Sequence, residues 1–305
     1  MKNNRKLARS IYFALAASFS HAACATELGL TNYSIGVNGI LDGILPKPGG
    51  TVLLNYNLYD KSTKFINNSG DSGIPDFENT TFVTSFRTIH TWNYSNGGWT
   101  ISSAFNVPIV RSKTSIMGMS DTETGIGAID LEPLHVNYVN PSNTFFSSFF
   151  VDIFIKSGGY DSRRLANVHQ NYDSITPLYS YTWFINRNWS TSATTGIEFP
   201  LERNDETLYK SGDVFFIHPS VEYTPTGNPK LHFGFSPYYI KQLSDDKLPG
   251  ARLEGGGRTR ATALGALVRY DFSEKVSAVL KYNNEVSARN RSESDPLWFQ
   301  IGYIF

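Results

Sequence analysis

The last ten residues of the chain, Pro296-Leu297-Trp298-Phe299-Gln300-Ile301-Gly302-Tyr303-Ile304-Phe305, alternate in a regular way. Successive side chains of a β-strand point to opposite faces. One face would therefore carry only Leu297, Phe299, Ile301, Tyr303 and Phe305, and the other Trp298, Gln300, Gly302 and Ile304. The stretch predicts a strand from about 296 to the final residue, with one face in an apolar environment.

The other end of the chain has the pattern of an export signal. Four basic residues lie within the first nine positions, an apolar run follows at 11–19, and the small residues Ala23 and Ala25 precede Thr26. Such a run is too short to span a bilayer, and the pattern is typical of a cleaved signal peptide. We expect residues 1–25 to be removed. Cys24, the single cysteine, would leave with them, so no disulfide is expected.

Between the two ends, short alternating segments rich in Thr, Ser, Tyr, Phe, Ile and Val predict strands rather than helices. We count twelve, at about 51–60, 79–93, 98–111, 125–139, 144–157, 171–185, 189–201, 212–224, 230–243, 259–272, 275–288 and 296–305. Their connections alternate in length. Short ones lie near 95–97, 140–143, 186–188, 226–229 and 272–274, and long polar ones near 61–78, 112–124, 158–170, 202–211, 244–258 and 289–295.

This alternation is typical of one architecture. Membrane barrels of the bacterial outer membrane have tight periplasmic turns and long extracellular loops. Aromatic residues make up 14% of the chain while the mean hydropathy is −0.26, as expected of a barrel that is apolar outside and wet inside. We predict an all-β fold: a transmembrane antiparallel β-barrel of about twelve strands over residues 51–305, with both termini on the periplasmic side.

The strand faces support this interpretation at most positions. Around Asp130 and Glu132 the apolar phase changes, from Ile129 and Leu131 to Leu134. An extra residue in one strand produces such a change, and proline is tolerated at the irregularity. We expect a β-bulge near Pro133.

Aromatic residues gather beside the short turns. Trp92 and Trp99 flank one turn, and Trp183 and Trp189 another. Amphipathic rings at the edge of an apolar band form the interfacial girdle of membrane barrels. At the end of the last strand, Phe305 with Tyr303 has the form of the insertion signal that the barrel-assembly machinery recognises. Outer-membrane lipid and this machinery are therefore the expected partners.

Charged residues at inward-facing positions have mixed signs. The candidates are Arg87, Asp152, Lys156, Glu198, Glu222, Arg269, Lys281 and Glu285. With 27 basic and 27 acidic residues in the whole chain, neither a strong ion filter nor a nucleic-acid partner is indicated. These residues could line a pore, or they could form ion pairs that only stabilise the wall.

His218 and Ser220 lie two residues apart on one strand face, as the His and Ser of outer-membrane phospholipases do. The predicted register points both inward, near Glu222, rather than toward lipid. Neither an orienting group nor an oxyanion donor can be identified from the sequence. We therefore expect a hydrogen-bonded luminal cluster, no catalytic residues and no bound metal or cofactor.

Residues 26–50 form no clear strand and contain Ile40, Leu41, Ile44, Leu45 and Pro46. A barrel of twelve strands is wider than one that side chains alone can fill. We hypothesise that this segment is a plug whose Gly39–Pro48 stretch folds into the barrel from the periplasmic side.

The run Gly36-Val37-Asn38-Gly39-Ile40-Leu41-Asp42-Gly43-Ile44-Leu45-Pro46-Lys47-Pro48-Gly49-Gly50, followed by Leu54-Asn55-Tyr56-Asn57-Leu58-Tyr59, resembles the mature N-terminus of one family. This is the meta-pathway phenol degradation family, also called SphA-like. The specific part is Pro-x-Pro-Gly-Gly before an Asn-Tyr-x-x-Tyr strand. The resemblance implies an outer-membrane barrel for uptake of hydrophobic or aromatic compounds, distantly like the FadL-type transporters. It supplies no catalytic residues.

Such a role suits the predicted inner face, which would carry Phe146, Phe150, Phe154, Phe216, Tyr238 and Trp298. These rings could stack on an aromatic solute, or they could pack against the N-terminal segment. We expect a passive channel for small hydrophobic or aromatic molecules. The alternatives are an adhesive barrel that binds partners through its loops and, third, a lipolytic enzyme.

Overall fold

The computed structural model describes residues 29–157 and 159–305. The predicted signal peptide lies outside these residues. Within the described part, no helix has the length and apolarity needed to cross a membrane.

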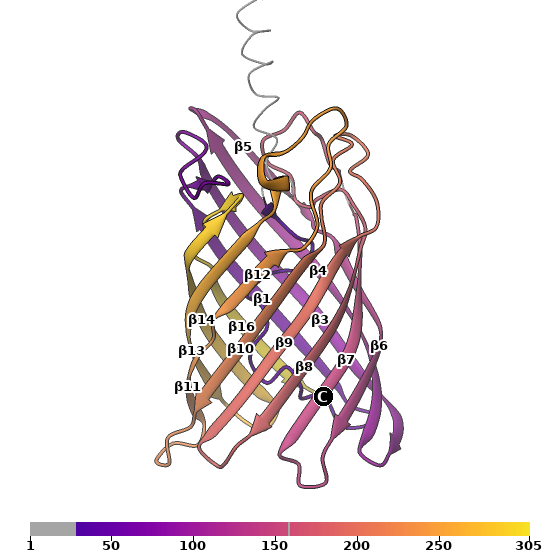
Figure 1. Cartoon of the computed structure of the whole chain (residues 1–305). Coiled ribbons are helices and arrows are strands. Elements are labelled where there is room, and N and C mark those ends of the chain that lie inside the picture. The colour runs from indigo at the N-terminus through magenta and orange to yellow at the C-terminus, as the bar shows by residue number, and fades with distance from the viewer. Residues whose placement is uncertain (1–28, 158) are drawn as a thin grey trace, which may run out of the picture.

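The described residues form one closed antiparallel barrel with a wall of twelve strands (Figure 1). The wall consists of β1 (Thr51–Ser62), β3 (Glu78–Asn96), β4 (Trp99–Ile116), β6 (Ile129–Val139), β7 (Phe145–Ile155), β8 (Ser174–Phe184), β9 (Trp189–Pro200), β10 (Val214–Tyr223), β11 (Leu231–Phe235) with β12 (Tyr238–Gln242), β13 (Arg260–Asp271), β14 (Val276–Arg289) and β16 (Leu297–Ile304). The ring closes where β16 pairs with β1, from Val52 opposite Ile304 to Tyr59 opposite Leu297. The predicted fold class is confirmed.

The two faces of each strand differ as the alternation predicts. On β13, Ala261, Ala263 and Leu267 are buried in the interior, whereas Leu264 and Val268 are 49% and 40% exposed on the outside. Apolar side chains exposed to lipid cost no free energy, so the outer band is stable in a bilayer. In water the same band would be a large exposed apolar surface.

Tight turns gather at one end of the barrel and long loops at the other (Figure 1). The predicted aromatic residues lie on the outer surface at the turn end. Trp92, Trp99, Trp183 and Trp189 are each 45–50% exposed there. By the usual arrangement of outer-membrane barrels, the turn end is periplasmic and the loop end extracellular.

Three strand predictions need correction. The loop expected near 112–124 is largely a hairpin, because β4 continues to Ile116 and β5 (Met119–Ile126) pairs back onto it. The single strand expected at 230–243 is two, since it breaks at Ser236 and Pro237, and proline has no N–H for the ladder. The long loops at 61–78 and 289–295 also hold a small two-stranded ladder, β2 (Phe65–Ile66) with β15 (Arg291–Ser292).

The predicted bulge near Pro133 is confirmed. The register of β6 shifts between Leu131 and His135 against β7, and the register of β4 shifts between Ser102 and Ala104 against β6. The bulge changes which side chains point inward. Glu132 lies on the inner face before it and His135 on the inner face after it, and both are buried.

Residues 29–50 run through the inside of the barrel, along its whole length. At the loop end, Gly29 packs so closely on Arg291 that a Cβ on the glycine would lie 2.3 Å from the Arg291 Cβ. At the turn end, Gly49 N–H donates to Thr91 O at 2.8 Å just before β1 begins. The Gly39–Pro48 stretch thus lies inside the barrel, as hypothesised, but it is part of a segment that spans the whole lumen and does not fold in from the turn end alone. Gly29, the first described residue, lies at the loop end. β1 begins at the turn end, and the C-terminal Phe305 also lies there.

Candidate functional site: the lumen and its N-terminal segment

The upper part of the segment is bound by one carboxylate of the wall. Glu198 on β9 accepts hydrogen bonds from Asn32 N–H at 3.1 Å and from Tyr33 N–H at 2.9 Å. The Tyr33 ring stacks on Phe216 of β10, with centroids 4.0 Å apart and planes 13° from parallel. A backbone segment that forms no ladder of its own thus obtains partners for its N–H groups from the inner wall.

The middle of the segment meets a buried lysine. Lys281 on β14 is 2% exposed, and its Nζ donates to Val37 O at 3.2 Å and to Asn38 O at 2.7 Å. Nearby, the Gly36 N–H lies 3.4 Å from the His218 Nε2. A charged donor shared by two carbonyls is among the stronger hydrogen-bonding arrangements in proteins.

The lower part of the segment forms a tight turn that is held by Asp42. Its carboxylate accepts from the N–H groups of Gly39 and Ile40 within the segment, and from Thr194 Oγ1 of the wall at 2.7 Å. The segment then approaches β8 closely, where Gly43 N–H donates to Thr182 Oγ1 at 3.1 Å. A Cβ at Gly43 would lie 2.5 Å from Thr182 N, so only glycine fits without displacement.

The six aromatic residues predicted to face inward all lie on the inner side of the wall. Phe150, Phe154, Phe216, Tyr238 and Trp298 are at most 5% exposed. Phe216 stacks on Tyr33, and Tyr238 and Trp298 lie against Gly36. Phe150 stacks on His135 at 4.4 Å, and Phe146 is half-buried near Phe184. Several of these rings therefore contact the segment, and their contact with a solute stays a prediction.

Most of the predicted luminal charges are paired. Arg87 forms two hydrogen bonds to Glu132, with Nε 2.6 Å from Oε1, and His135 Nε2 lies 2.8 Å from the same carboxylate. Glu222 accepts from Arg269 Nε at 3.0 Å. This arrangement agrees with the interpretation that many of these charges stabilise the wall.

Lys156 is an exception to the predicted placement. It follows the end of β7, and its Nζ lies 2.6 Å from Glu202 Oε1 and 2.8 Å from Asp205 Oδ2, in the loop region. These hydrogen bonds raise the pKa of the lysine above its ordinary value. Lys156 joins two loops and does not line the lumen, because the strand ends before it.

His218 and Ser220 point inward, as the register predicts, and both are buried. Among the residues that the structure describes, neither His218 Nδ1 nor Ser220 Oγ has a hydrogen-bond partner. Glu222 pairs with Arg269 rather than with the histidine. The contacts of these residues give no support for a hydrolytic dyad.

Ile40, Leu41, Ile44 and Leu45 line a cavity of about 310 Å³ beside the segment, toward the turn end. A second cavity of about 210 Å³ lies beside the segment at the loop end. A third, of about 70 Å³, lies between these two and shares lining residues with both. Pro46 lies half-buried beside them, with its Cβ 3.2 Å from the position a Cβ on Gly50 would take. The segment thus leaves a row of narrow spaces between itself and the wall.

Sequence reasoning missed the wall residues that bind the segment, above all Thr194, Thr182 and Ser192, whose Oγ accepts from Leu41 N–H at 3.2 Å. Serine and threonine on a polar strand face look like ordinary lumen-lining residues, and nothing in the spacing points to residues 39–43 as their partner. Asp42 between Gly39 and Gly43 was the available signal, since it marks a tight turn with close approach of the backbone.

Two solved outer-membrane proteins have a similar barrel. An outer membrane channel from Pseudomonas putida F1 superposes with a TM-score of 0.75 at 16% identity, covering 87% of this chain and 98% of that one. The transport unit of the autotransporter AIDA-I from Escherichia coli superposes with a TM-score of 0.54 at 9% identity, covering 95% of this chain and 97% of that one. These similarities show the outer-membrane barrel fold.

No curated protein shows significant sequence similarity to the chain. The family model described as "Putative MetA-pathway of phenol degradation" matches residues 62–301. This range lies outside the N-terminal run that carries the resemblance, so the two observations are independent. With most of the barrel matched, the chain belongs to the family of that description.

Proposed function

We propose that this protein is a narrow outer-membrane channel for passive uptake of small hydrophobic or aromatic molecules. The N-terminal segment sets its width. The observation that carries the proposal is the course of residues 29–50 through the lumen, which leaves spaces of about 210 and 310 Å³ between the segment and the wall. The similarity to a solved protein described as an outer membrane channel supports a channel role.

The lining of the upper space supports the solute class. Its apolar residues include Leu58, Phe77, Val110, Val168 and Trp298. Polar residues such as Asp60, Asn79 and Arg291 line the same space, so a ring-bearing solute could stack on the aromatic rings while its polar groups meet hydrogen-bonding partners. Two of the luminal carboxylates, Glu132 and Glu222, have arginine partners, so these two add little attraction for an ion that passes through the lumen.

Two experiments test the two parts of the proposal separately. For the restriction, the full chain and a variant lacking residues 27–47 are reconstituted in liposomes, and swelling in small sugars is measured. We expect slow swelling with the full chain and a several-fold faster rate with the deletion. Equal rates would show that the segment does not restrict the lumen.

For the solute class, uptake of a labelled monocyclic aromatic compound at low concentration is measured in cells with and without the gene. A small sugar serves as the reference solute. We expect the deletion strain to lose aromatic uptake while sugar uptake is maintained by general porins. Unchanged aromatic uptake would contradict the solute class and leave the result on restriction unaffected.

A further inference from the structure

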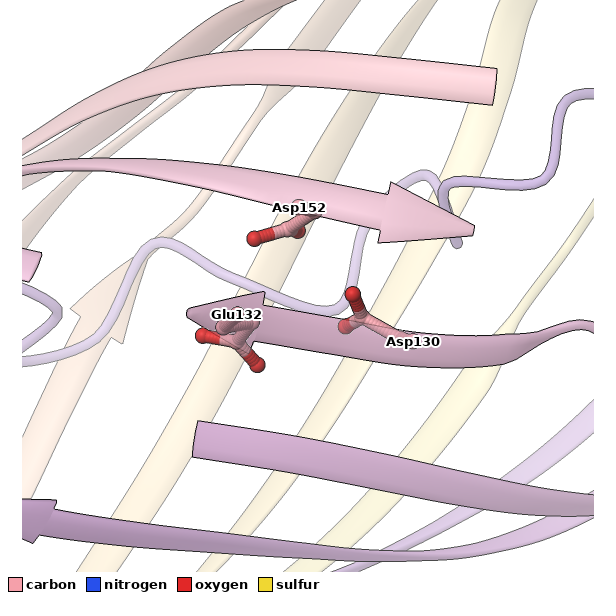
Figure 2. A group of neighbouring side chains, drawn as sticks. All are labelled: Asp130, Glu132 and Asp152. Atoms are coloured by element: carbon pink, nitrogen blue, oxygen red, sulfur yellow. The ribbon is translucent and has the colours of Figure 1, made fainter. Parts of the chain in front are cut away.

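Three carboxylates converge on the inner wall of the barrel. Asp130 and Glu132 lie on β6 and Asp152 on the neighbouring strand β7 (Figure 2). One oxygen from each can be chosen so that all three lie within 4.8 Å of one another. Their residues are 5%, 0% and 4% exposed.

The three carboxylates are not equally satisfied. Glu132 has Arg87 and His135 as partners. The Oδ1 atoms of Asp130 and Asp152 are buried and, among the described residues, have no hydrogen-bond partner. Burying an ionised carboxylate without a partner is strongly unfavourable, so the two aspartates are either protonated or bound to an occupant that the protein itself does not provide.

The charge balance limits what the occupant can be. Three carboxylates face a single guanidinium, that of Arg87, which is already bound to Glu132. Two negative charges are therefore uncompensated when all three acids are ionised. A divalent cation would neutralise them, whereas a water molecule would not.

Space for such an ion lies beside Asp130 and Asp152. The cavity of about 70 Å³ is lined by Asp130 and Asp152, and also by Tyr33 and Trp298. The Tyr33 hydroxyl and the Trp298 Nε1 are likewise buried without a hydrogen-bond partner in the described part of the chain. Of these four groups, the two carboxylate oxygens and the Tyr33 hydroxyl can accept a cation or its water, whereas the Trp298 N–H can only donate.

We propose that this cavity binds a hard divalent cation, Ca²⁺ in preference to Mg²⁺, with Asp130 and Asp152 as ligands and Glu132 beside them. The donors are all carboxylate oxygens, which hard cations prefer, and no thiolate is present to favour zinc among the described residues. Ca²⁺ tolerates an irregular ligand arrangement, whereas Mg²⁺ requires a nearly ideal octahedron. The site goes beyond the proposed channel function and does not depend on it.

The test uses the full-length barrel in detergent micelles, first stripped with EDTA. Thermal unfolding is followed while Ca²⁺, or Mg²⁺ as the competitor, is added. We expect the Tm to rise by roughly 5 °C at a hundred times the dissociation constant of Ca²⁺. We also expect Tb³⁺, used as a luminescent calcium analogue, to be sensitised through the nearby Trp298 and displaced by Ca²⁺.

Asp130→Asn and Asp152→Asn keep the side-chain shape and remove the charged ligands. Both should abolish the Ca²⁺ shift and the Tb³⁺ signal, and removing the repulsion should leave the metal-free proteins at least as stable. Glu222→Gln is the matched control, since Glu222 is an equally buried inner-face carboxylate paired with Arg269. It should retain the full response.

Two results would overturn the proposal. In the first, wild-type protein shows no response to Ca²⁺ or Tb³⁺ at millimolar concentration, which would mean that the two aspartates share a proton instead. In the second, the double variant Asp130→Asn/Asp152→Asn keeps the response, which would mean that the ion binds elsewhere. Neither result bears on the liposome experiment, so the two proposals can fail separately.

Discussion

Individual side chains of the wall determine how firmly the N-terminal segment is bound. Glu198, Lys281 and Thr194 each contact it at a different level of the lumen. The segment therefore has several independent attachments, each of the size of one or two hydrogen bonds. Weakening one of these attachments should raise the permeability of the channel partly and should not open the channel fully.

Lys281→Met tests the middle attachment. It removes the donor to Val37 O and Asn38 O and keeps most of the side-chain volume. Loss of a charged hydrogen bond costs about 2 kcal/mol. We expect a lower Tm and faster liposome swelling than in wild type.

Lys241→Met is the control for that substitution, because Lys241 is exposed on the outer face of β12. It should leave the swelling rate unchanged. Equal swelling rates of the Lys281 variant and wild type would show that the lysine does not hold the segment.

Gly43→Ala tests the closest approach between segment and wall. The new Cβ would lie 2.5 Å from Thr182 N and 2.6 Å from Phe146 O, and neither backbone atom can move away cheaply. Overpacking of this kind costs about 1–3 kcal/mol. We expect a lower Tm together with higher permeability as the segment shifts.

Gly227→Ala provides the reference, since nothing lies within 4 Å of a Cβ there. It should behave as wild type in both measurements. A Gly43 variant with wild-type stability would mean that the segment does not lie against β8.

The sequence predicted which residues point inward, but it could not predict their partners. Alternation along β7 places Phe150 and Asp152 on the inner face, and the structure has them there. The contact between Glu198 and Tyr33 joins residues 165 positions apart, and no local pattern encodes it. Pairing across the lumen depends on the position of the whole segment.

At the scale of elements, the long loops are connected to one another by ion pairs. Arg164, in the loop after β7, donates to both oxygens of Asp121 on β5, at 3.0 and 2.9 Å. It also contacts Glu123 on the same strand. The β4–β5 hairpin extends beyond its neighbours at the loop end (Figure 1), and Arg164 connects it to the adjacent loop.

Acid should release this connection only at very low pH. The hydrogen bonds from Arg164 hold the pKa of Asp121 well below its ordinary value. Stabilisation from a depressed pKa is fully present above the unfolded value, about 3.9, and is lost as the pH falls through the folded value. We expect the hydrogen-exchange protection factors of residues 119–126, which correct for the pH dependence of intrinsic exchange, to be unchanged from pH 7 to about 5. They should decrease once the pH is well below about 4.

Arg164→Ala should show the faster exchange already at pH 7, and Asp121→Asn should remove the acid-dependent step. Arg163→Ala is a suitable control, because Arg163 pairs with Asp161 in its own loop. If the wild-type hairpin were released at pH 5, the ion pair with Arg164 could not be what holds it.

Predictions of elements succeeded where periodicity was long and failed where it was interrupted. All twelve wall strands were predicted, because a strict alternation of apolar and polar residues over many positions is specific to strands with two different faces. The β4–β5 hairpin has the composition of a loop, since Ser and Thr are its commonest residues, and polar residues on both faces hide the period of two. The break at Pro237 is hidden because apolar residues continue on both sides of it.

For the molecule as a whole, closure depends on the pairing of the last strand with the first. Phe305 N–H donates to Thr51 O at 2.9 Å, and its ring, 65% exposed, contacts Tyr303 at the turn end. Because the ring is exposed, it contributes little to the folded barrel. Its predicted role is recognition during insertion.

Removing Phe305 should therefore separate assembly from stability. We expect several-fold less folded protein in the outer membrane of cells, measured by heat-modifiable migration in gels. Protein refolded in detergent should keep nearly the wild-type Tm. Phe305→Trp should restore assembly, and normal assembly without any aromatic terminus would argue against the insertion signal.

The path of residues 29–50 also constrains the order of biogenesis. The segment leads directly into β1, and β1 meets β16 at the seam of the ring. Either the barrel closes around residues 29–50, or this segment must thread through a barrel that has already closed. Since Gly29 lies against Arg291 among the long loops, a tag fused directly ahead of it would begin at the cell surface. A folded domain fused there would have to pass between β1 and β16 before these two strands pair.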